Sequence, residues 1–137
     1  MYEILIVGGG PAGLTAAIYA ARAGKHVAVL ERGSTGGQII SAPLVENYPG
    51  IPSVSGTELA RQMTEQACTF GAEIVYTEAV GLEKTPAGFR VLCTDGVREA
   101  KTVILATGAA HRSLGLAAED ALTGCGVSYC AVCDGAF

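Results

Sequence analysis

The sequence predicts an α/β fold, in which a parallel sheet carries helices and an antiparallel β-meander is inserted. Three observations support this prediction. Short apolar runs alternate with helix-like stretches over residues 2–76, a glycine-rich turn at 8–13 joins the first strand to the first helix, and several short β-like runs follow one another between 79 and 101. Alternating strands and helices are typical of parallel sheets, whereas successive short strands with tight turns are typical of antiparallel ones.

The first strand is expected over residues 2–7, because this run is apolar, β-branched and too short for a helix. It leads directly into GGGPAG at 8–13, whose glycines fit the pattern G-x-G-x-x-G. The first glycine allows a tight turn, Gly10 lets backbone approach a pyrophosphate, and Gly13 lets the helix pack on the sheet. Pro11 suits the first helical position, where its missing N–H costs nothing.

A helix is expected to follow from Leu14 to a stop at Gly24, and a second strand over 26–30 ends in Glu31. The carboxylate lies 18 residues beyond Gly13, near the spacing at which an acid accepts hydrogen bonds from the ribose hydroxyls of an adenine dinucleotide. Strand, glycine turn, helix, strand and acid in this order predict a Rossmann-like dinucleotide-binding unit, with phosphates at the helix N-terminus. A glycine-rich turn without a ligand is the alternative.

Residues 32–50 form a polar, glycine-rich stretch that is too long for a simple turn. Gly36 and Gly37 would let backbone approach a flat ring, and Gln38 and Asn47 carry both donors and acceptors for the polar edge of such a ring. An ordinary surface loop made of turn residues is the alternative.

A second helix is expected to begin at the capping box Ser55-Gly-Thr-Glu58 and to end at Gly71. Its apolar residues recur at helical spacing and are expected in the core: Leu59, Met63, Ala67 and Phe70.

After a strand at 73–76, the meander is expected from β-like segments at 79–83, 89–93 and 98–101. A separate strand at 102–105 then opens onto Ala106-Thr107-Gly108, where backbone would come close to the same ligand.

Composition excludes some function classes. The 137 residues are 50% hydrophobic, enough for one core, and the net charge of −4 without a basic run argues against nucleic-acid binding. The uncharged run from Ile4 to Ala21 is interrupted by three glycines and Pro11, so no membrane span is expected. The five scattered cysteines lack a secreted disulfide framework, which favours a cytoplasmic protein.

Two of these cysteines, Cys130 and Cys133, have the C-x-x-C spacing of a reversible redox pair, and Asp134 follows directly with a carboxyl group suited to proton transfer. Taken alone, this spacing also fits half of a zinc site. With Cys125 it matches the first three ligands of a plant-type iron–sulfur cluster, although the fourth cysteine is missing downstream.

The ordered motifs GGGPAG, TGGQ, VENYPG, FGAEI, ATGAAHR and GVSYCAVCDGAF resemble those of the low-molecular-weight bacterial thioredoxin reductases, over essentially residues 2–137. The resemblance implies FAD as cofactor, NADPH as co-substrate, thioredoxin or a thioredoxin-like small protein as partner, and a homodimer when complete. Cys130 and Cys133 match the redox-active pair, and Asp134 matches the proton donor and acceptor. The cofactor-binding residues that we predict are Gly8, Gly10, Pro11, Ala12, Gly13, Glu31, Arg32, Gly36, Gly37, Gln38, Asn47, Val80, Ala106, Thr107 and Gly108.

The chain departs from this family in where it stops. We expect residues 1–113 to form the N-terminal part of an FAD-binding domain and residues 114–137 to begin an NADPH and redox-disulfide domain that is truncated. The FAD-binding domain is therefore expected to be incomplete at its C-terminus, and the second glycine fingerprint, for NADPH, is not in these residues. We expect the chain alone to be inactive as a reductase. The alternative is a non-catalytic FAD-binding or inert fragment.

Overall fold

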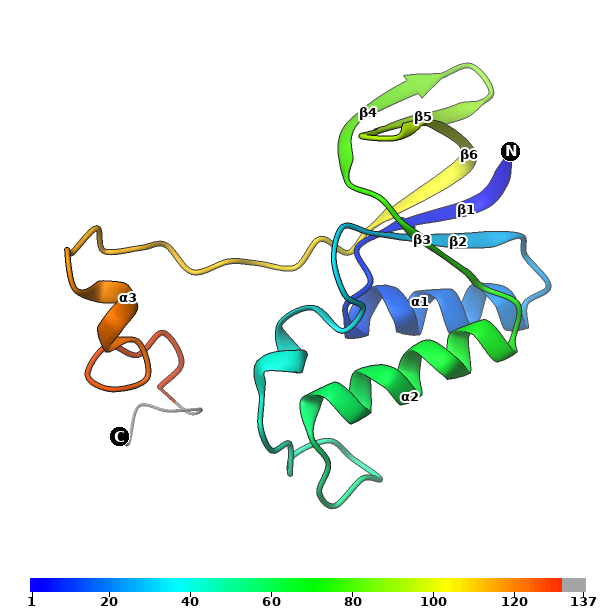
Figure 1. Ribbon diagram of the computed structural model, residues 1–137. Coiled ribbons are helices and arrows are strands. Elements are labelled where there is room, and N and C mark those ends of the chain that lie inside the picture. Colours follow the sequence, from blue (N-terminus) through cyan, green and yellow to red (C-terminus); the bar gives the residue numbers. More distant parts are fainter. Residues whose placement is uncertain (132–137) are drawn as a thin grey trace.

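A computed structural model of the chain describes residues 1–131 and has a six-stranded sheet in the order β3-β2-β1-β6-β5-β4. Helices α1 and α2 lie side by side against one face of the sheet, and the hairpin of β4 and β5 curls away at the other end (Figure 1). The expected α/β fold with an antiparallel insertion is confirmed. The elements are β1 (Tyr2–Val7), α1 (Pro11–Arg22), β2 (Val27–Glu31), the 3-10 helix η1 (Gly37–Ser41), α2 (Gly56–Thr69), β3 (Glu73–Tyr76), β4 (Ala79–Thr85), β5 (Gly88–Cys93), β6 (Gly96–Leu105) and α3 (Glu119–Leu122).

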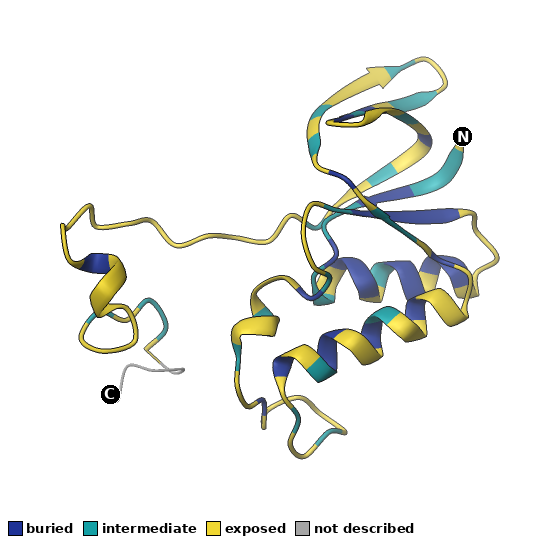
Figure 2. Ribbon diagram, viewed as in Figure 1, coloured by how far each residue is buried: buried dark blue, intermediate teal, exposed yellow. Residues whose placement is uncertain are grey.

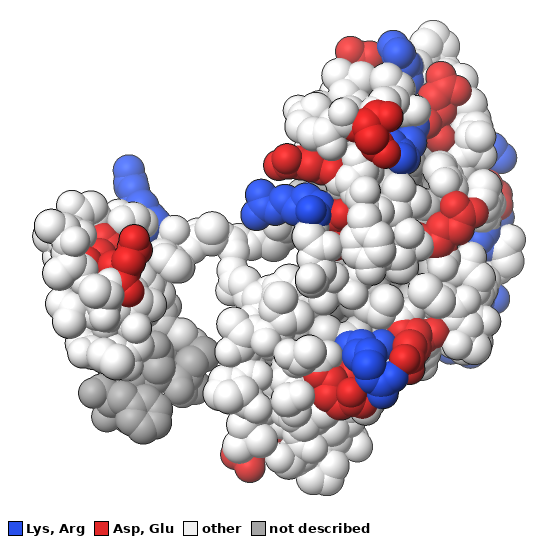
Figure 3. Space-filling view, in the orientation of Figure 1, with Lys and Arg blue, Asp and Glu red and all other residues white. Residues whose placement is uncertain are grey.

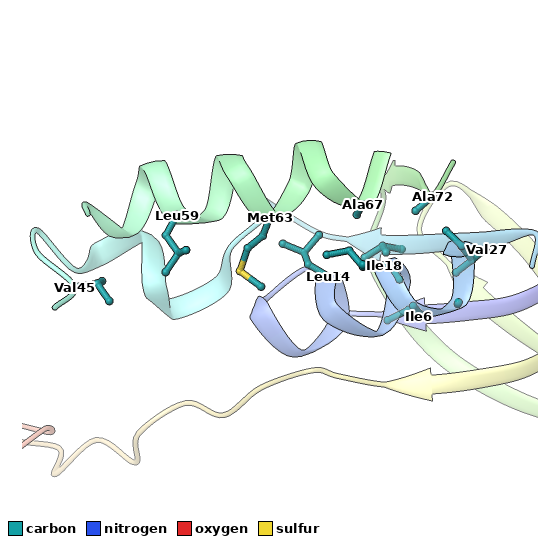
Figure 4. Close-up of a cluster of buried hydrophobic side chains, with 13 residues drawn as sticks. Ile6, Leu14, Ile18, Val27, Val45, Leu59, Met63, Ala67 and Ala72 are labelled. Carbon is teal, nitrogen blue, oxygen red and sulfur yellow. The ribbon is translucent and has the colours of Figure 1, made fainter. Parts of the chain in front are cut away.

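The parallel half of the sheet consists of β3, β2, β1 and the second half of β6. Strand β2 is almost wholly buried, which explains why its sequence is a continuous apolar run and not an alternating one. Alternate residues face the helices, where they meet Leu14 and Ile18 of α1 and Leu59 and Met63 of α2 (Figure 4). The inner faces of both helices are correspondingly buried (Figure 2).

The opposite face of the sheet is covered by the meander. Leu5 and Leu30 point away from the helices and pack with Val91, Cys93 and Ala100 in a second buried cluster. The antiparallel insertion therefore completes the core of the parallel sheet instead of forming a unit of its own.

Strand β6 corrects the expectation of two separate strands at 98–101 and 102–105. It is one continuous strand, because its first half pairs with β5 in antiparallel register, as at Leu92↔Val97, and its second half pairs with β1 in parallel register, as at Val7↔Leu105. A single extended segment thus belongs to both parts of the sheet.

Helix α2 begins as expected, with Ser55 Oγ accepting from the backbone N–H of Glu58 at 3.1 Å. The Glu58 carboxylate binds Arg61 and Gln62, and these bonds, with Arg61 contributing most, lower its pKa to about 2. The expectation that Phe70 lies in the core is wrong. The residue is 42% exposed, and the guanidinium of Arg22 lies over its ring at 5.5 Å from the centroid. Phe70 is the C-cap of the helix and does not continue its buried face.

Beyond β6 the chain leaves the sheet and runs exposed over residues 107–118 to a small C-terminal segment that contains α3 (Figure 1). Glu119, 4% exposed, holds this segment together. Its carboxylate accepts from the backbone N–H groups of Leu114, Gly115 and Leu116 at 2.7–3.2 Å and from the hydroxyl of Ser113 at 2.9 Å. Burial acts to raise the pKa of Glu119, but these hydrogen bonds outweigh it and the pKa is lowered.

Gly13 provides a test of the contact between α1 and the sheet. A Cβ at this position would lie 1.9 Å from the carbonyl oxygen of Gly8, which the helix cannot avoid without moving off the sheet. We expect Gly13→Ala to lower the free energy of unfolding in urea by about 2–3 kcal/mol. In the control Gly10→Ala, the new Cβ has no neighbour closer than 4.0 Å, so the loss should not exceed about 1 kcal/mol. Equal losses would contradict this account.

Glu119 gives a pH-dependent prediction. Since its pKa is lowered from the ordinary value of 4.5, its bonds to residues 113–116 are fully present above that pH and are lost as the pH falls through the lowered value. We expect the amide shifts of Leu114, Gly115 and Leu116 to move together in that acidic range in an NMR titration. Glu119→Gln should abolish this transition, and a midpoint above 4.5 in the unmodified chain would show that the carboxylate is not stabilised.

Candidate functional site

A cavity of about 900 Å³ opens at the carboxyl ends of β1, β2 and β6. Ligands of α/β proteins bind outside the carboxyl ends of parallel strands, in pockets of roughly 300–1,000 Å³. The lining residues are Val7, Gly8, Gly10, Pro11, Ala12, Leu30, Glu31, Arg32, Gly37, Gln38, Ile39, Thr77, Glu78, Ala79, Leu105, Ala106, Thr107, Gly108 and Ala109.

The glycine turn forms the floor of this cavity. Gly8 has φ +107°, and a Cβ there would lie 2.2 Å from the carbonyl oxygen of Ala106, so only glycine fits. Its N–H donates to the carbonyl of Leu30 at 2.9 Å, and the N–H of Ala106 donates to the carbonyl of Val7 at 2.8 Å. The ends of three strands are therefore joined at one turn.

Gly10 is the N-cap of α1, and a Cβ at this position would meet only two backbone atoms, both at 4.0 Å. No side chain of the described residues caps the helix. Helix geometry leaves the first amides without partners within the helix, and the helix dipole favours an anion there. The open space above Gly10 and these amides fit a pyrophosphate.

Glu31 stands at the end of β2, on the cavity wall. One carboxylate oxygen, Oε2, accepts from the N–H of Gly9 and the other, Oε1, from the N–H of Gly33, each at 2.8 Å. A carboxylate offers about four acceptor positions. The side chain is thus held in place by two amides while acceptor capacity is left for the hydroxyls of a ribose.

The loop at 36–38 connects the glycine turn to the segment that follows β6. The N–H of Gly36 donates to the carbonyl of Gly9 at 2.7 Å, and the side-chain amide of Gln38 donates to the carbonyl of Ala109. Gly36 itself lies behind the lining, because a Cβ there would be 2.5 Å from the side chain of Ala60. Gly37 and Gln38 line the cavity next to these two contacts.

Four predicted cofactor-binding residues do not line the cavity. Gly13 and Gly36 pack beneath it, and Asn47 is exposed in the loop that leads to α2. Val80 is 64% exposed, because a β-bulge between Ala79 and Gly81 breaks the regular pairing of β4 next to it.

The remaining eleven predicted cofactor-binding residues all line the cavity. The sequence reasoning missed Thr77, Glu78 and Ala79, which lie where β3 passes into β4. No motif marks these three residues. The one signal that could have found them is the general rule that the carboxyl ends of parallel strands meet at one edge of the sheet, since β3 ends beside β2.

Charge around the site is mixed. Arg32 lies at the mouth of the cavity, with its guanidinium 3.9 Å from the carboxylate of Glu78. Figure 3 shows side chains of both signs over α2 and the meander, and no basic field. This face thus offers no broad attraction for a polyanion.

A smaller hollow of about 380 Å³ lies between residues 34–40 and α2. Four of its polar side chains are already paired with one another, because Thr64 donates to the hydroxyl of Thr35 at 2.9 Å and Arg61 binds Glu65. The cavity at the strand ends is therefore the candidate site.

Of the predicted redox residues, Cys130 lies within the described part of the chain, and Cys133 and Asp134 lie outside it. Cys130 is disulfide-bonded, whereas Cys68, Cys93 and Cys125 carry free thiols. The C-terminal segment with Cys130 lies apart from the glycine turn (Figure 1), so the structure does not bring this cysteine to the cavity.

Within the part of the chain that the structure describes, no group of three or more His, Cys, Asp or Glu residues gathers closely enough to hold a metal ion. None of the helices within residues 1–131 is both long and apolar enough to cross a membrane.

Comparison with known proteins gives a consistent result. The profile of the pyridine nucleotide-disulphide oxidoreductase family matches residues 2–137. The thioredoxin reductases of Listeria monocytogenes and Treponema pallidum are 45% and 46% identical to the chain, which is matched over 100% and 99% of its length but spans only 43% and 45% of theirs. Crystal structures of the thioredoxin reductases of Streptococcus pyogenes and Lactococcus lactis match it with TM-scores of 0.88 and 0.84 at 50% and 42% identity. Each comparison covers the whole chain and 45% of the solved one.

The open position at Gly10 gives a test of where a ligand's phosphates lie. Gly10→Val places two methyl groups in the cavity, and we expect it to weaken binding of ADP or FAD at least about tenfold, measured by NMR or fluorescence titration, with an unchanged circular dichroism spectrum. The control is Ala87→Val, which adds the same two methyl groups at an exposed position in the turn between β4 and β5 that does not line the cavity. Equal affinities of the two variants would contradict the placement.

Proposed function

The chain belongs to the pyridine nucleotide-disulphide oxidoreductase family, and from this premise we propose that it supplies the FAD site and the redox-active cysteines of a thioredoxin reductase. In this proposal electrons pass from NADPH through FAD and the pair Cys130 and Cys133 to the disulfide of thioredoxin. The chain spans less than half of the length of the relatives that carry this name. The activity is therefore proposed for the protein that also contains the NADPH site.

The proposal rests on the cavity at the strand ends. A helix N-terminus without a capping side chain, the open space at Gly10 and the anchored carboxylate of Glu31 occur together at one edge of the sheet. These three features match the pyrophosphate and the ribose of a dinucleotide. Gly37, Gln38 and residues 106–108 lie on the other side of the glycine turn and would hold the flavin end.

FAD, when bound, supplies the electron chemistry that amino-acid side chains cannot perform, taking a hydride from NADPH and passing two electrons on. The chain's own residues bind and orient the cofactor and transfer protons. The backbone amides of α1 hold the phosphates, and Glu31 accepts from the ribose hydroxyls. Asp134 is proposed to exchange a proton with the thiol of the neighbouring pair as a thiolate forms or is quenched.

The cysteine pair carries the second half of the reaction. Reduction of its disulfide consumes two electrons and two protons, and the resulting dithiol attacks the disulfide of thioredoxin through a mixed disulfide. Because the C-terminal segment that contains α3 lies apart from the carboxyl ends of the strands (Figure 1), this segment must approach the flavin end when electrons are transferred. Residues 107–118 are exposed and join the two parts of the chain, which is consistent with a proposed division into residues 1–113 and 114–137.

For the complete protein we further propose a homodimer that acts on thioredoxin or a similar small protein. For these 137 residues alone, a non-catalytic fragment is the second candidate. Two observations favour it: the chain holds one dinucleotide fingerprint, and it covers only 43–45% of the relatives' length.

The test uses the chain alone and the chain extended through the NADPH half. We expect the extended protein to show the twin visible bands of bound flavin and to reduce thioredoxin with NADPH, and the 137 residues alone to show no turnover. Cys130→Ser and Cys133→Ser should each lower thioredoxin reduction by a factor of about 1,000 or more without loss of flavin. The matched control is Cys125→Ser, which removes an exposed free thiol and should keep full activity. Turnover that survives in the Cys130→Ser or Cys133→Ser variant would refute the proposed electron path.

A further inference from the structure

Thr77 is one of the two polar or charged residues buried within the described part of the chain, and it is 7% exposed. It lies between β3 and β4, where it lines the cavity. Its N–H donates to the backbone carbonyl of Glu31 at 2.9 Å, so the wall formed by residues 77–79 is connected to the strand end that carries the ribose-binding acid.

The regular hydrogen bonding of the sheet does not extend through this wall. Thr77 and Glu78 belong to no strand, and β4 begins with a bulge between Ala79 and Gly81. A bulge leaves a residue unpaired and weakens the ladder locally. Contacts beyond the regular strand pairs therefore help to hold the wall in place.

The turn between β5 and β6 supplies this support from outside the cavity. The hydroxyl of Thr77 donates to Oδ1 of Asp95, and the N–H of Thr94 donates to the carbonyl of Glu78 at 3.0 Å. Neither Thr94 nor Asp95 lines the cavity. Both residues of the turn thus hold the wall from behind.

Asp95 is itself fixed by Arg98. The two terminal nitrogens of the guanidinium donate to the two carboxylate oxygens, each at 2.8 Å, a paired geometry that sets the orientation of the carboxylate. The bonds from Arg98 first, and then the bond from Thr77, lower the pKa of Asp95. The carboxylate is therefore charged at neutral pH and accepts from both partners at once.

We propose that Asp95 is a positioning residue for the adenosine end of the bound dinucleotide: through Thr77 it holds residues 77–79 at their place beside Glu31. This inference rests on the proposed function, in which the ribose lies at Glu31 and the adenine next to it. A wall that is already in place spares the ligand the cost of ordering it.

The test compares Asp95→Ala and Thr77→Val with the unmodified chain. Two quantities are measured: hydrogen exchange of the amides at positions 77 and 94 without ligand, and the affinity for ADP by NMR titration. Both variants should raise the exchange rates and weaken ADP binding by about threefold to tenfold, the range expected when a part-buried hydrogen bond is lost. The double variant should be no weaker than Asp95→Ala alone, because both changes remove the same contact.

Two further variants separate positioning from general stability. Asp95→Asn keeps an acceptor for the Thr77 hydroxyl and should restore most of the ADP affinity. Glu83→Ala breaks another ion pair on the same meander, in which the Glu83 carboxylate lies 3.1 Å from the guanidinium of Arg90. Neither residue lines the cavity. This control should leave both the exchange rates and the affinity unchanged.

Unchanged exchange at position 94 in Asp95→Ala would overturn the proposal, and so would faster exchange with full ADP affinity. An effect of Glu83→Ala as large as that of Asp95→Ala would also overturn it, since any broken ion pair would then suffice. A protein extended through the NADPH half that binds neither ADP nor FAD would contradict the proposed function instead. The exchange rates would in that case still decide whether Asp95 holds the wall.

Discussion

The contact on which the rest of the structure depends is a meeting of backbones at Gly8. A side chain there would lie 2.2 Å from the carbonyl of Ala106, and a side chain at Gly13 would lie 1.9 Å from the carbonyl of Gly8. The ends of β1 and β6 and the first turn of α1 therefore approach as closely as they do only because two Cβ atoms are missing. The same closeness lets α1 seal the buried cluster around Leu14 and directs its amides into the cavity. Stability and ligand recognition thus share one turn.

The meander extends this dependence to the other face of the sheet. Because β6 is shared, burial of Val91 and Ala100 against Leu5 also fixes the strand end that leads to the cavity floor. The turn between β5 and β6 also contacts the cavity wall, because Asp95 accepts a hydrogen bond from the hydroxyl of Thr77. The wall near Glu31 is therefore held by tertiary contacts, whereas the floor is held by the glycine turn itself.

This difference explains how much could be predicted from the sequence. The strand, turn, helix and acid up to Glu31 are local patterns, and their residues lie where the patterns place them. Val80 was predicted to bind the cofactor but is exposed, and the wall at 77–79 was missed, because a bulge and a long-range turn decide which residues face inward. Phe70 kept the helical spacing of a core residue, but the helix ends at Thr69, and a spacing rule carries no information beyond the last turn.

The two edges of the parallel sheet differ in what satisfies them. At the amino ends of β1, β2 and β3, side chains pair with one another: Glu73 accepts from Tyr2 at 2.9 Å and lies 3.1 Å from His26, and Glu3 binds Lys25 and the N–H of His26. The bond from Tyr2, and then that from His26, lowers the pKa of Glu73. The carboxyl ends also carry side-chain pairs, such as Arg32 with Glu78, but they present backbone amides and the anchored Glu31 to the cavity. Side chains that pair with one another leave few hydrogen-bonding groups for a ligand, whereas the amides at a helix N-terminus leave several. The direction of the parallel strands therefore accounts for a binding site at one edge of the sheet and a closed surface at the other.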